Sequence, residues 1–266
     1  MYQFSYQKAK SLSDAAAALA KNADARLLAG GQTLIASMKM RLVSPSDLVD
    51  LSGIAELRGI KVDGSTLTVS AMTSHADVAA SSEVKKAIPA LARLAGEIGD
   101  RMIRNLGTLG GSVANNDPAA DYPAGALGLG ATINTNKRKI AADQFFKGMY
   151  ETALESGEII TSVSFPVPKR AGYAKFKNPA SRYAMVGVFV SEGTGGVRVA
   201  VTGAGPSVFR VAAMEKALTA KFSADAIASI QVSATGLNND LHATAEYRAH
   251  LVTVMAKRAV EQTLST

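Results

Sequence analysis

The first fifty residues alternate short apolar runs with polar or glycine-rich breaks, a pattern that is typical of a small α+β unit. Ser13 or Asp14 can cap an alanine-rich helix that runs to about Lys21. The pattern then predicts a short buried strand, a glycine pair, a short helix and a second strand, at Arg26–Ala29, Gly30-Gly31, Thr33 to about Arg41, and Asp47–Leu51. We place the end of this lobe at residue 53.

The middle of the chain opens on a hairpin pattern, because apolar residues alternate on both sides of Asp63-Gly64. Residues 101–121 contain many glycines and have little helical character. The other elements that we predict in this second α+β lobe, residues 54–170, are helices at 74–80, 88–98 and 119–129, two strands that flank the basic turn at 136–139, and a strand at 157–165 that Pro166 and Pro168 stop.

The last part of the chain has a different pattern, in which strands come first and helices follow. We predict three strands, at 184–191, 197–201 and 207–211, and helices at 212–220, 224–230 and 243–264. Strands followed by helices favour a separate C-terminal α+β domain, residues 171–266, with a three-stranded antiparallel sheet.

Composition and charge narrow the function classes. The 266 residues are 47% hydrophobic, which allows a sizeable core, and they contain no cysteine. Without cysteine the chain cannot hold a disulfide, a thiolate nucleophile or its own iron–sulfur cluster. The net charge is +7, but the basic residues are scattered and no aromatic residues alternate with them, so we do not expect a nucleic-acid partner.

We expect a cytoplasmic protein, because the start of the chain has no basic and apolar leader. We also expect no transmembrane segment, since Gly, Asp or Lys interrupts every apolar stretch before it reaches about 18 residues.

Two glycine clusters are candidates for binding a phosphate. At Gly30-Gly31 a strand meets a short helix, so backbone N–H groups and a helix N-terminus can approach an anion; alone, the pair is better explained as a tight turn. The second cluster, Gly107-Thr-Leu-Gly-Gly-Ser112, places hydroxyl groups beside successive glycines, which favours an anion-binding nest over a structural corner.

Other familiar chemistry is missing from the sequence. Neither cluster has the spacing G-x-G-x-x-G, and there is no Walker motif. The three histidines, His75, His242 and His250, have no metal-ligand spacing, and each is better explained as a packing or surface residue. We therefore expect no metal site and no catalytic side chain.

Two motifs and their surroundings resemble the FAD-binding medium subunits of molybdenum hydroxylases. These motifs are Leu28-Ala-Gly-Gly-Gln-Thr-Leu-Ile35 and Ile103-Arg-Asn-Leu-Gly-Thr-Leu-Gly-Gly-Ser112, the second followed by Asp117-Pro-Ala-Ala-Asp-Tyr-Pro-Ala124. Essentially the whole chain is similar to the carbon monoxide dehydrogenase type, and the xanthine dehydrogenase FAD domain is a more distant relative. The resemblance implies a vanillyl-alcohol-oxidase or PCMH-type FAD-binding fold of two α+β lobes, followed by the C-terminal domain.

The resemblance also implies roles for individual residues. The two glycine motifs would hold the FAD pyrophosphate, through Ala29, Gly30, Gly31, Gln32, Thr33 and Leu34 and through Thr108, Leu109, Gly110, Gly111 and Ser112. Asp121 would lie near the ribose or adenosine part, and Ile98, Ile160 and Lys177 would line the flavin. Tyr183 would lie against the isoalloxazine, where an aromatic ring can stack. Because cysteine is absent and no histidine lies in the glycine motifs, we expect non-covalent FAD.

The function implied is that of an electron-transfer flavoprotein subunit. Electrons from a molybdenum cofactor on a large subunit would pass through 2Fe-2S clusters on a small subunit to FAD on this chain, and then to a quinone or NAD+. The three subunits would form a heterotrimer that dimerises. Two alternatives stay open: a stand-alone FAD oxidoreductase of the same fold, and a non-catalytic assembly subunit.

Overall fold

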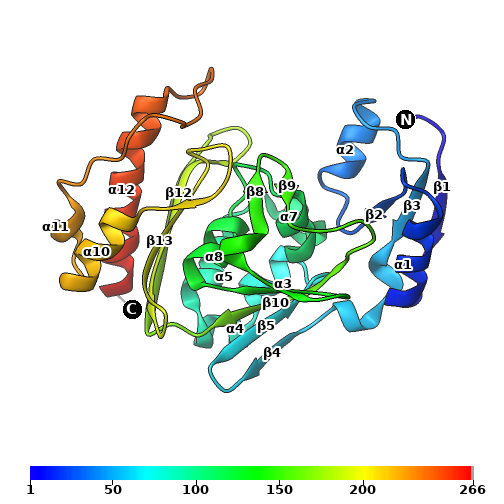
Figure 1. Cartoon of the computed structure of the whole chain (residues 1–266), viewed down its shortest axis with the longest axis horizontal. Helices are drawn as coiled ribbons and strands as arrows, with labels where there is room; N and C mark the ends of the chain where they lie inside the picture. The colour runs from blue at the N-terminus through cyan, green and yellow to red at the C-terminus, as the bar shows by residue number, and fades with distance from the viewer. Residues whose placement is uncertain (265–266) are drawn as a thin grey trace.

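The computed structural model describes residues 1–264 and arranges them in three adjacent parts, with the N-terminal lobe and the C-terminal domain at opposite ends (Figure 1). The N-terminal lobe has a three-stranded parallel sheet in the order β1-β3-β2. Its elements are β1 (Ser5–Lys8), α1 (Leu12–Lys21), β2 (Arg26–Leu28), α2 (Leu34–Lys39) and β3 (Asp47–Asp50). The predicted helix, strand, helix and strand are confirmed, except that β2 is an edge strand whose residues are exposed or half-buried rather than buried.

The middle part is a five-stranded antiparallel sheet in the order β4-β5-β10-β6-β7. The strands are β4 (Ile60–Asp63), β5 (Thr66–Ser70), β6 (Thr132–Thr135), β7 (Lys139–Ala141) and β10 (Ile160–Pro166). The remaining elements are η1 (Leu51–Gly53), η2 (Ala55–Leu57), α3 (His75–Ala80), α4 (Ser82–Ala87), α5 (Pro89–Gly96), α6 (Arg101–Leu106), α7 (Leu109–Asn115), α8 (Tyr122–Leu129), α9 (Ala142–Phe145), β8 (Phe146–Gly148) and β9 (Glu151–Thr152). The predicted hairpin and the strands beside the basic turn are confirmed.

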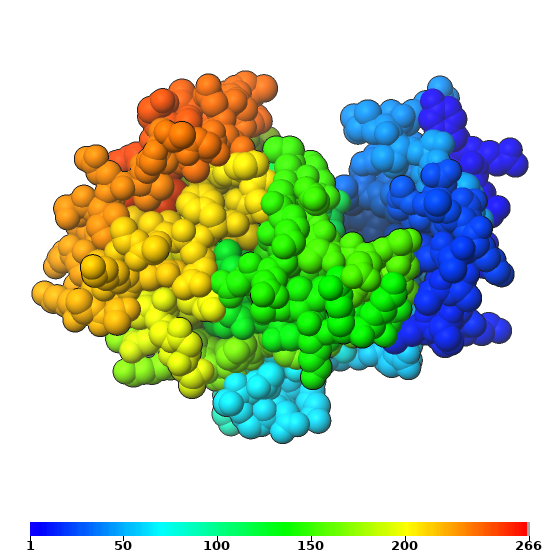
Figure 2. All heavy atoms as spheres, in the orientation of Figure 1, coloured from blue at the N-terminus to red at the C-terminus, as the bar shows by residue number. Residues whose placement is uncertain are grey.

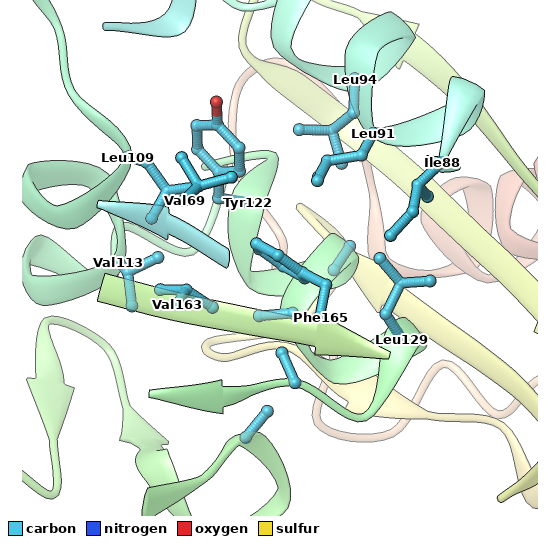
Figure 3. Packing of buried hydrophobic residues seen from close by; sticks show 14 of the residues in the cluster. Val69, Ile88, Leu91, Leu94, Leu109, Val113, Tyr122, Leu129, Val163 and Phe165 are labelled. Carbon is cyan, nitrogen blue, oxygen red and sulfur yellow. The ribbon is translucent and has the colours of Figure 1, made fainter. Parts of the chain in front are cut away.

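The core of the middle part lies between this sheet and the helices. Helix α8 is apolar on every side, and all of its residues are buried, so it is an internal helix rather than an amphipathic surface helix. Figure 3 shows side chains from α7 and α8 gathered with side chains from β5 and β10, namely Leu109, Val113, Tyr122, Val69, Val163 and Phe165. This packing fixes the start of α7, which borders the candidate site.

The glycine-rich stretch 101–121 contains two short helices, α6 and α7, contrary to the prediction, because side chains cap each of them. Asp100 accepts a hydrogen bond from the backbone N–H of Ile103 at 2.9 Å and so caps α6. The Thr108 hydroxyl accepts from the backbone N–H of Gly111 at 3.2 Å and caps α7. The glycines in α7 are therefore helical residues, and their effect is to let the helix approach its neighbour closely.

The C-terminal domain has a four-stranded antiparallel sheet in the order β11-β12-β13-β14, one strand more than predicted. Its elements are β11 (Arg170–Lys177), β12 (Ala184–Gly193), β13 (Gly196–Thr202), β14 (Phe209–Arg210), α10 (Ala212–Ala220), α11 (Ala224–Ile227) and α12 (Ala245–Leu264). The extra strand is β11. Consecutive residues Gly172, Tyr173 and Ala174 are all buried, so the strand lacks the alternation that marks a half-exposed strand.

The basic turn after β6 is anchored to the protein by hydrogen bonds and is not a freely solvated loop. Arg138 donates to both carboxylate oxygens of Glu158, at 3.0 and 3.1 Å, and the Glu158 side chain is fully buried. Thr135 and the backbone N–H of Glu155 also donate to this carboxylate, each at 2.8 Å. The hydrogen bonds, those from Arg138 most of all, lower the pKa of Glu158 from 4.5 to about 2.

Glu158→Gln is therefore expected to reduce the acid sensitivity of folding. The lowered pKa means that the ionised side chain stabilises the fold above pH 4.5, and that this contribution is lost as the pH falls toward 2. Urea unfolding at pH 7, 4.5 and 3 measures the effect. Glu155→Gln is the control, because Glu155 contacts the same arginine from an exposed position. If Glu158→Gln and the wild type lose the same free energy of unfolding between pH 4.5 and 3, this account of the turn is wrong.

Candidate functional site

A cavity of about 470 Å³ lies between the N-terminal lobe and the middle part. Figure 2 shows the surface hollowed at this place, between the N-terminal residues in blue and the middle residues in green. Both predicted glycine motifs border the cavity, together with the loop that carries Tyr183. The volume is in the range of small-molecule and cofactor sites.

The structure brings most of the predicted site residues together. The predicted residues that line the cavity are Ala29, Gly30, Gly31, Gln32, Thr33, Leu34, Ile98, Thr108, Gly110, Gly111, Ser112, Asp121, Ile160 and Tyr183. Two predicted residues do not line it. Leu109 is fully buried in the core, and Lys177 is exposed at the end of β11.

Sequence reasoning missed several lining residues, among them Arg26, His75, Asn115, Asp117 and Arg182. Asn115 and Asp117 directly follow the second glycine motif, and Arg182 directly precedes Tyr183, so their position next to predicted residues was the available signal. His75 carried no such signal, because a single histidine at the start of a helix is usually a packing residue.

The first glycine motif leaves its backbone donors available. Within residues 1–264, the N–H groups of Gly30, Gly31, Gln32 and Thr33 have no hydrogen-bond acceptor in the protein. Gly31 has φ +69°, which glycine adopts at little cost, and Thr33 is the N-cap residue of α2. A row of unpaired amides that ends at a helix N-terminus is suited to binding an anion.

Most backbone donors of the second glycine motif are already engaged, although the N–H of Thr108 has no acceptor within residues 1–264. The N–H of Leu109 donates to the carbonyl of Thr73 at 3.1 Å, and the N–H of Gly110 donates to the carbonyl of Ala71 at 2.8 Å. Gly111 donates to the Thr108 hydroxyl. These three amides are therefore not free to form the expected nest, and the motif meets the cavity through side chains such as the half-buried Ser112.

Gly110 is needed for close packing. A Cβ at this position would lie 2.5 Å from the Cβ of Ala71 and 2.8 Å from its carbonyl oxygen. Because Ala71 directly follows β5 and is itself buried, neither atom can move away cheaply. The sequence favoured an anion-binding nest over a structural corner at this motif. For Gly110 the structure supports the structural corner, because the close contact with Ala71 requires a glycine.

Asp121 lies at the cavity wall in a buried polar cluster. Its carboxylate oxygen Oδ1 is 2.8 Å from Nζ of Lys175 and accepts a short hydrogen bond from the Tyr173 hydroxyl. Lys175 also donates to the carbonyl of Glu97 at 2.8 Å. Burial raises the pKa of Asp121, while Lys175 and Tyr173 oppose that shift and favour the carboxylate. The ion pair joins the C-terminal sheet to the middle part beside the cavity.

Tyr183 stands at the rim of the cavity, with 46% of its surface exposed. The turn before it is held by Asn178, whose side-chain oxygen accepts from the N–H groups of Ala180 and Ser181 at 2.9 and 3.1 Å. The backbone N–H of Asn178 also donates to the carbonyl of Tyr183 at 2.8 Å. Partial burial and the carboxylate of Asp117 raise the pKa of Tyr183, so the phenol is neutral at pH 7.

Residues 1–264 contain no cluster of three or more His, Cys, Asp or Glu side chains placed to hold a metal ion. The helices in that range include none that is long and apolar enough to span a bilayer.

Gly110→Ala is expected to destabilise the fold before any ligand is considered. The added methyl group overpacks the contact with Ala71, which costs about 1–3 kcal/mol. Gly96→Ala is the matched control, because it is also a helical glycine and its Cβ would meet only the Cβ of Ala79, at 3.8 Å. Urea unfolding without added ligand compares the two variants with the wild type. Equal free energies of unfolding for Gly110→Ala and the wild type would show that this contact does not need glycine.

The chain matches two family descriptions in succession. Residues 2–168 match the FAD binding domain in molybdopterin dehydrogenase, and residues 171–263 match the CO dehydrogenase flavoprotein C-terminal domain. The carbon monoxide dehydrogenase medium chain of Hydrogenophaga pseudoflava is 33% identical, with 97% of this chain and 96% of the relative covered. The xanthine dehydrogenase FAD-binding subunit of Escherichia coli O157:H7 is 29% identical, with 100% and 98% covered.

A solved structure supports the same assignment. Reconstituted CO dehydrogenase from Oligotropha carboxidovorans contains a chain that superposes with a TM-score of 0.92 at 33% identity, covering 99% of this chain and 98% of that one. The predicted α+β fold, with FAD-binding lobes and a C-terminal domain, is confirmed apart from the fourth strand. The chain belongs to the family of FAD-binding domains of molybdopterin dehydrogenases, and it is an FAD-binding medium subunit of the molybdenum hydroxylase type, an oxidoreductase.

Proposed function

We propose that this chain carries electrons from the 2Fe-2S clusters of a partner subunit through FAD to a quinone or NAD+. The observation that supports this most is the row of unpaired amides at residues 30–33 on the wall of a cofactor-sized cavity. Four donors beside a helix N-terminus match the charge and the acceptor oxygens of a diphosphate.

The residues around the cavity fit the other parts of FAD. Ile98 and Ile160 supply an apolar wall and Tyr183 an aromatic ring, which suit the flavin. Asp121 and Ser112 supply oxygen atoms that can bond to hydroxyl groups of the ligand. We leave Leu109 and Lys177 out of the proposed contacts, because neither lines the cavity. No residue here forms a covalent link in the proposal, since cysteine is absent and His75 is nearly buried.

When bound, FAD supplies the redox chemistry, because its ring system takes up electrons singly from iron–sulfur clusters and passes pairs to a quinone or NAD+. The residues of this chain bind and orient the cofactor and shape the approach to it. Tyr183 and Arg182, at the exposed rim, lie where an external acceptor would arrive. No side chain of this subunit needs to act on the primary substrate.

The proposed partners are those that the resemblance to medium chains of multi-subunit complexes implies. A small subunit would hold the 2Fe-2S clusters, which this chain cannot ligate without cysteine, and a large subunit would hold the molybdenum cofactor. We propose a heterotrimer that dimerises. We also keep the proposed division of the chain into residues 1–53, 54–170 and 171–266.

The electron route can be tested on the intact complex. The complex is isolated through a tag on this chain, reduced anaerobically with dithionite, freed of excess reductant by gel filtration, and mixed with NAD+ or a water-soluble quinone. We expect one acceptor to reoxidise the clusters rapidly. The same complex stripped of flavin should keep its reducible clusters but lose this reaction, and added FAD should restore it. Acceptor reduction that is unchanged by flavin removal would contradict the proposed route.

A further inference from the structure

His75 begins α3 and lies against the second glycine motif. Its backbone N–H donates to the carbonyl of Gly107 at 2.9 Å, and only 5% of the residue is exposed. A Cβ on Gly107 would lie 2.6 Å from Nε2 of His75, so the Nε2 edge of the ring lies directly on the glycine backbone. His75 nevertheless lines the cavity. Its ring is therefore held in one place, with a polar edge beside the cofactor site.

Two buried polar atoms next to each other have no partner. Within residues 1–264, Nδ1 of His75 and the hydroxyl of Tyr122 are buried and form no hydrogen bond. The two ring centroids are 5.3 Å apart, and the rings are tilted by 50°. A buried polar atom without a partner has lost its hydration and gained no hydrogen bond, so pairing is favourable for two such atoms on neighbouring side chains.

The protonation of the two groups makes them complementary. Burial, with a smaller contribution from the Asp121 charge, raises the pKa of the Tyr122 hydroxyl, which therefore keeps its proton and can donate. Burial, aided by the nearby Arg104 guanidinium, lowers the pKa of His75 to about 4. The imidazole is then neutral at pH 7, with one protonated nitrogen and one bare nitrogen. The Tyr122 hydroxyl is therefore a donor, and Nδ1 of a neutral imidazole can be its acceptor.

Pairing with Tyr122 determines which imidazole nitrogen of His75 carries the proton and can donate to a ligand. If Nδ1 accepts from Tyr122, the ring proton is on Nε2. Gly107 is contacted by the Nε2 edge of His75, and it is also contacted by Gly30, whose Cβ would lie 2.7 Å from the Gly107 Cα. His75 and the residues with unpaired amides, 30–33, therefore line one cavity, and Gly107 lies against both His75 and Gly30.

We propose that His75 donates a hydrogen bond through Nε2–H to a diphosphate oxygen of the bound cofactor, and that Tyr122 is a positioning residue that selects this tautomer. The inference rests on the proposed binding of FAD in this cavity. It gives the second glycine motif a neutral side-chain donor in place of the backbone amides that the fold has already engaged.

Nitrogen NMR of the imidazole rings tests the tautomer directly, because the chain has only three histidines. His75→Gln assigns the signal of His75 by its loss. In the ligand-free chain we expect that signal to be the neutral Nε2–H form throughout the range from about pH 5.5 to pH 8. Addition of FAD or ADP, which both contain a diphosphate, should shift Nε2, whereas riboflavin should not.

Binding measurements on three variants complete the test. His75→Leu removes the donor and should weaken FAD binding by about two- to tenfold, the worth of a neutral hydrogen bond. His75→Gln restores a side-chain N–H and should recover part of the loss. Tyr122→Phe should raise the share of the Nδ1–H tautomer and weaken FAD binding less than His75→Leu does. Riboflavin affinity should stay the same in all three variants.

The outcomes separate the two proposals. If the chain binds FAD but the His75 signal shows Nδ1–H, or if Nε2 does not respond to FAD and ADP, this inference is wrong while the cofactor site stands. Equal loss of FAD and riboflavin binding in His75→Leu also overturns it, because the residue would then only support the fold. A chain that binds no flavin overturns the proposed function and this inference together.

Discussion

The close contact of two backbones at Gly30 and Gly107 is the constraint on which the cofactor site depends. A Cβ on Gly30 would lie 2.2 Å from the carbonyl oxygen of Leu106, so no other residue fits at this position without displacing one of the two segments. The contact brings the N-terminal lobe against the end of α6, and residues 30–33, whose amides have no acceptor within residues 1–264, line the cavity beside it. The lobes thus meet through main chain, and the site is formed where they meet.

The two glycine motifs look equivalent in the sequence, but they have different structural roles. In the second motif the amides of Leu109 and Gly110 bond to the segment after β5, and Gly110 allows α7 to pack on Ala71. That motif builds the wall of the cavity. In the first motif the N–H groups of residues 30–33 have no acceptor within residues 1–264, so these donors remain available for an anion. A buried ion pair between Asp121 and Lys175 then ties the C-terminal sheet to the same wall.

Much of this arrangement could be predicted from local patterns, and the rest depends on contacts that a pattern does not contain. The strand, glycine pair and helix of the first motif follow from hydrophobic spacing and turn chemistry, and both are local. Strand β11 was missed because its buried residues 172–174 remove the alternation of a half-exposed strand, and the Lys175 side chain that follows is buried against Asp121, which is remote in sequence. Helix α7 was missed because glycine is read as a helix breaker unless the tight packing partner, here Ala71, is known. Helix α6 was missed because it is only six residues long and lies between Gly99 and Gly107. The position of His75 beside Gly107 was missed for a similar reason, because it depends on a contact between residues that are remote in sequence.

The central claim is that backbone amides of the first motif, rather than those of the second, hold the cofactor's diphosphate. Amide hydrogen exchange with and without FAD measures this most directly, because it reports each set of N–H groups separately. The account predicts that residues 30–33 exchange readily in the free chain and become protected when FAD binds. Residues 109–111 should be protected in both states, because their amides are already bonded. Protection that appears on FAD binding at residues 109–111, with none at 30–33, would contradict the account.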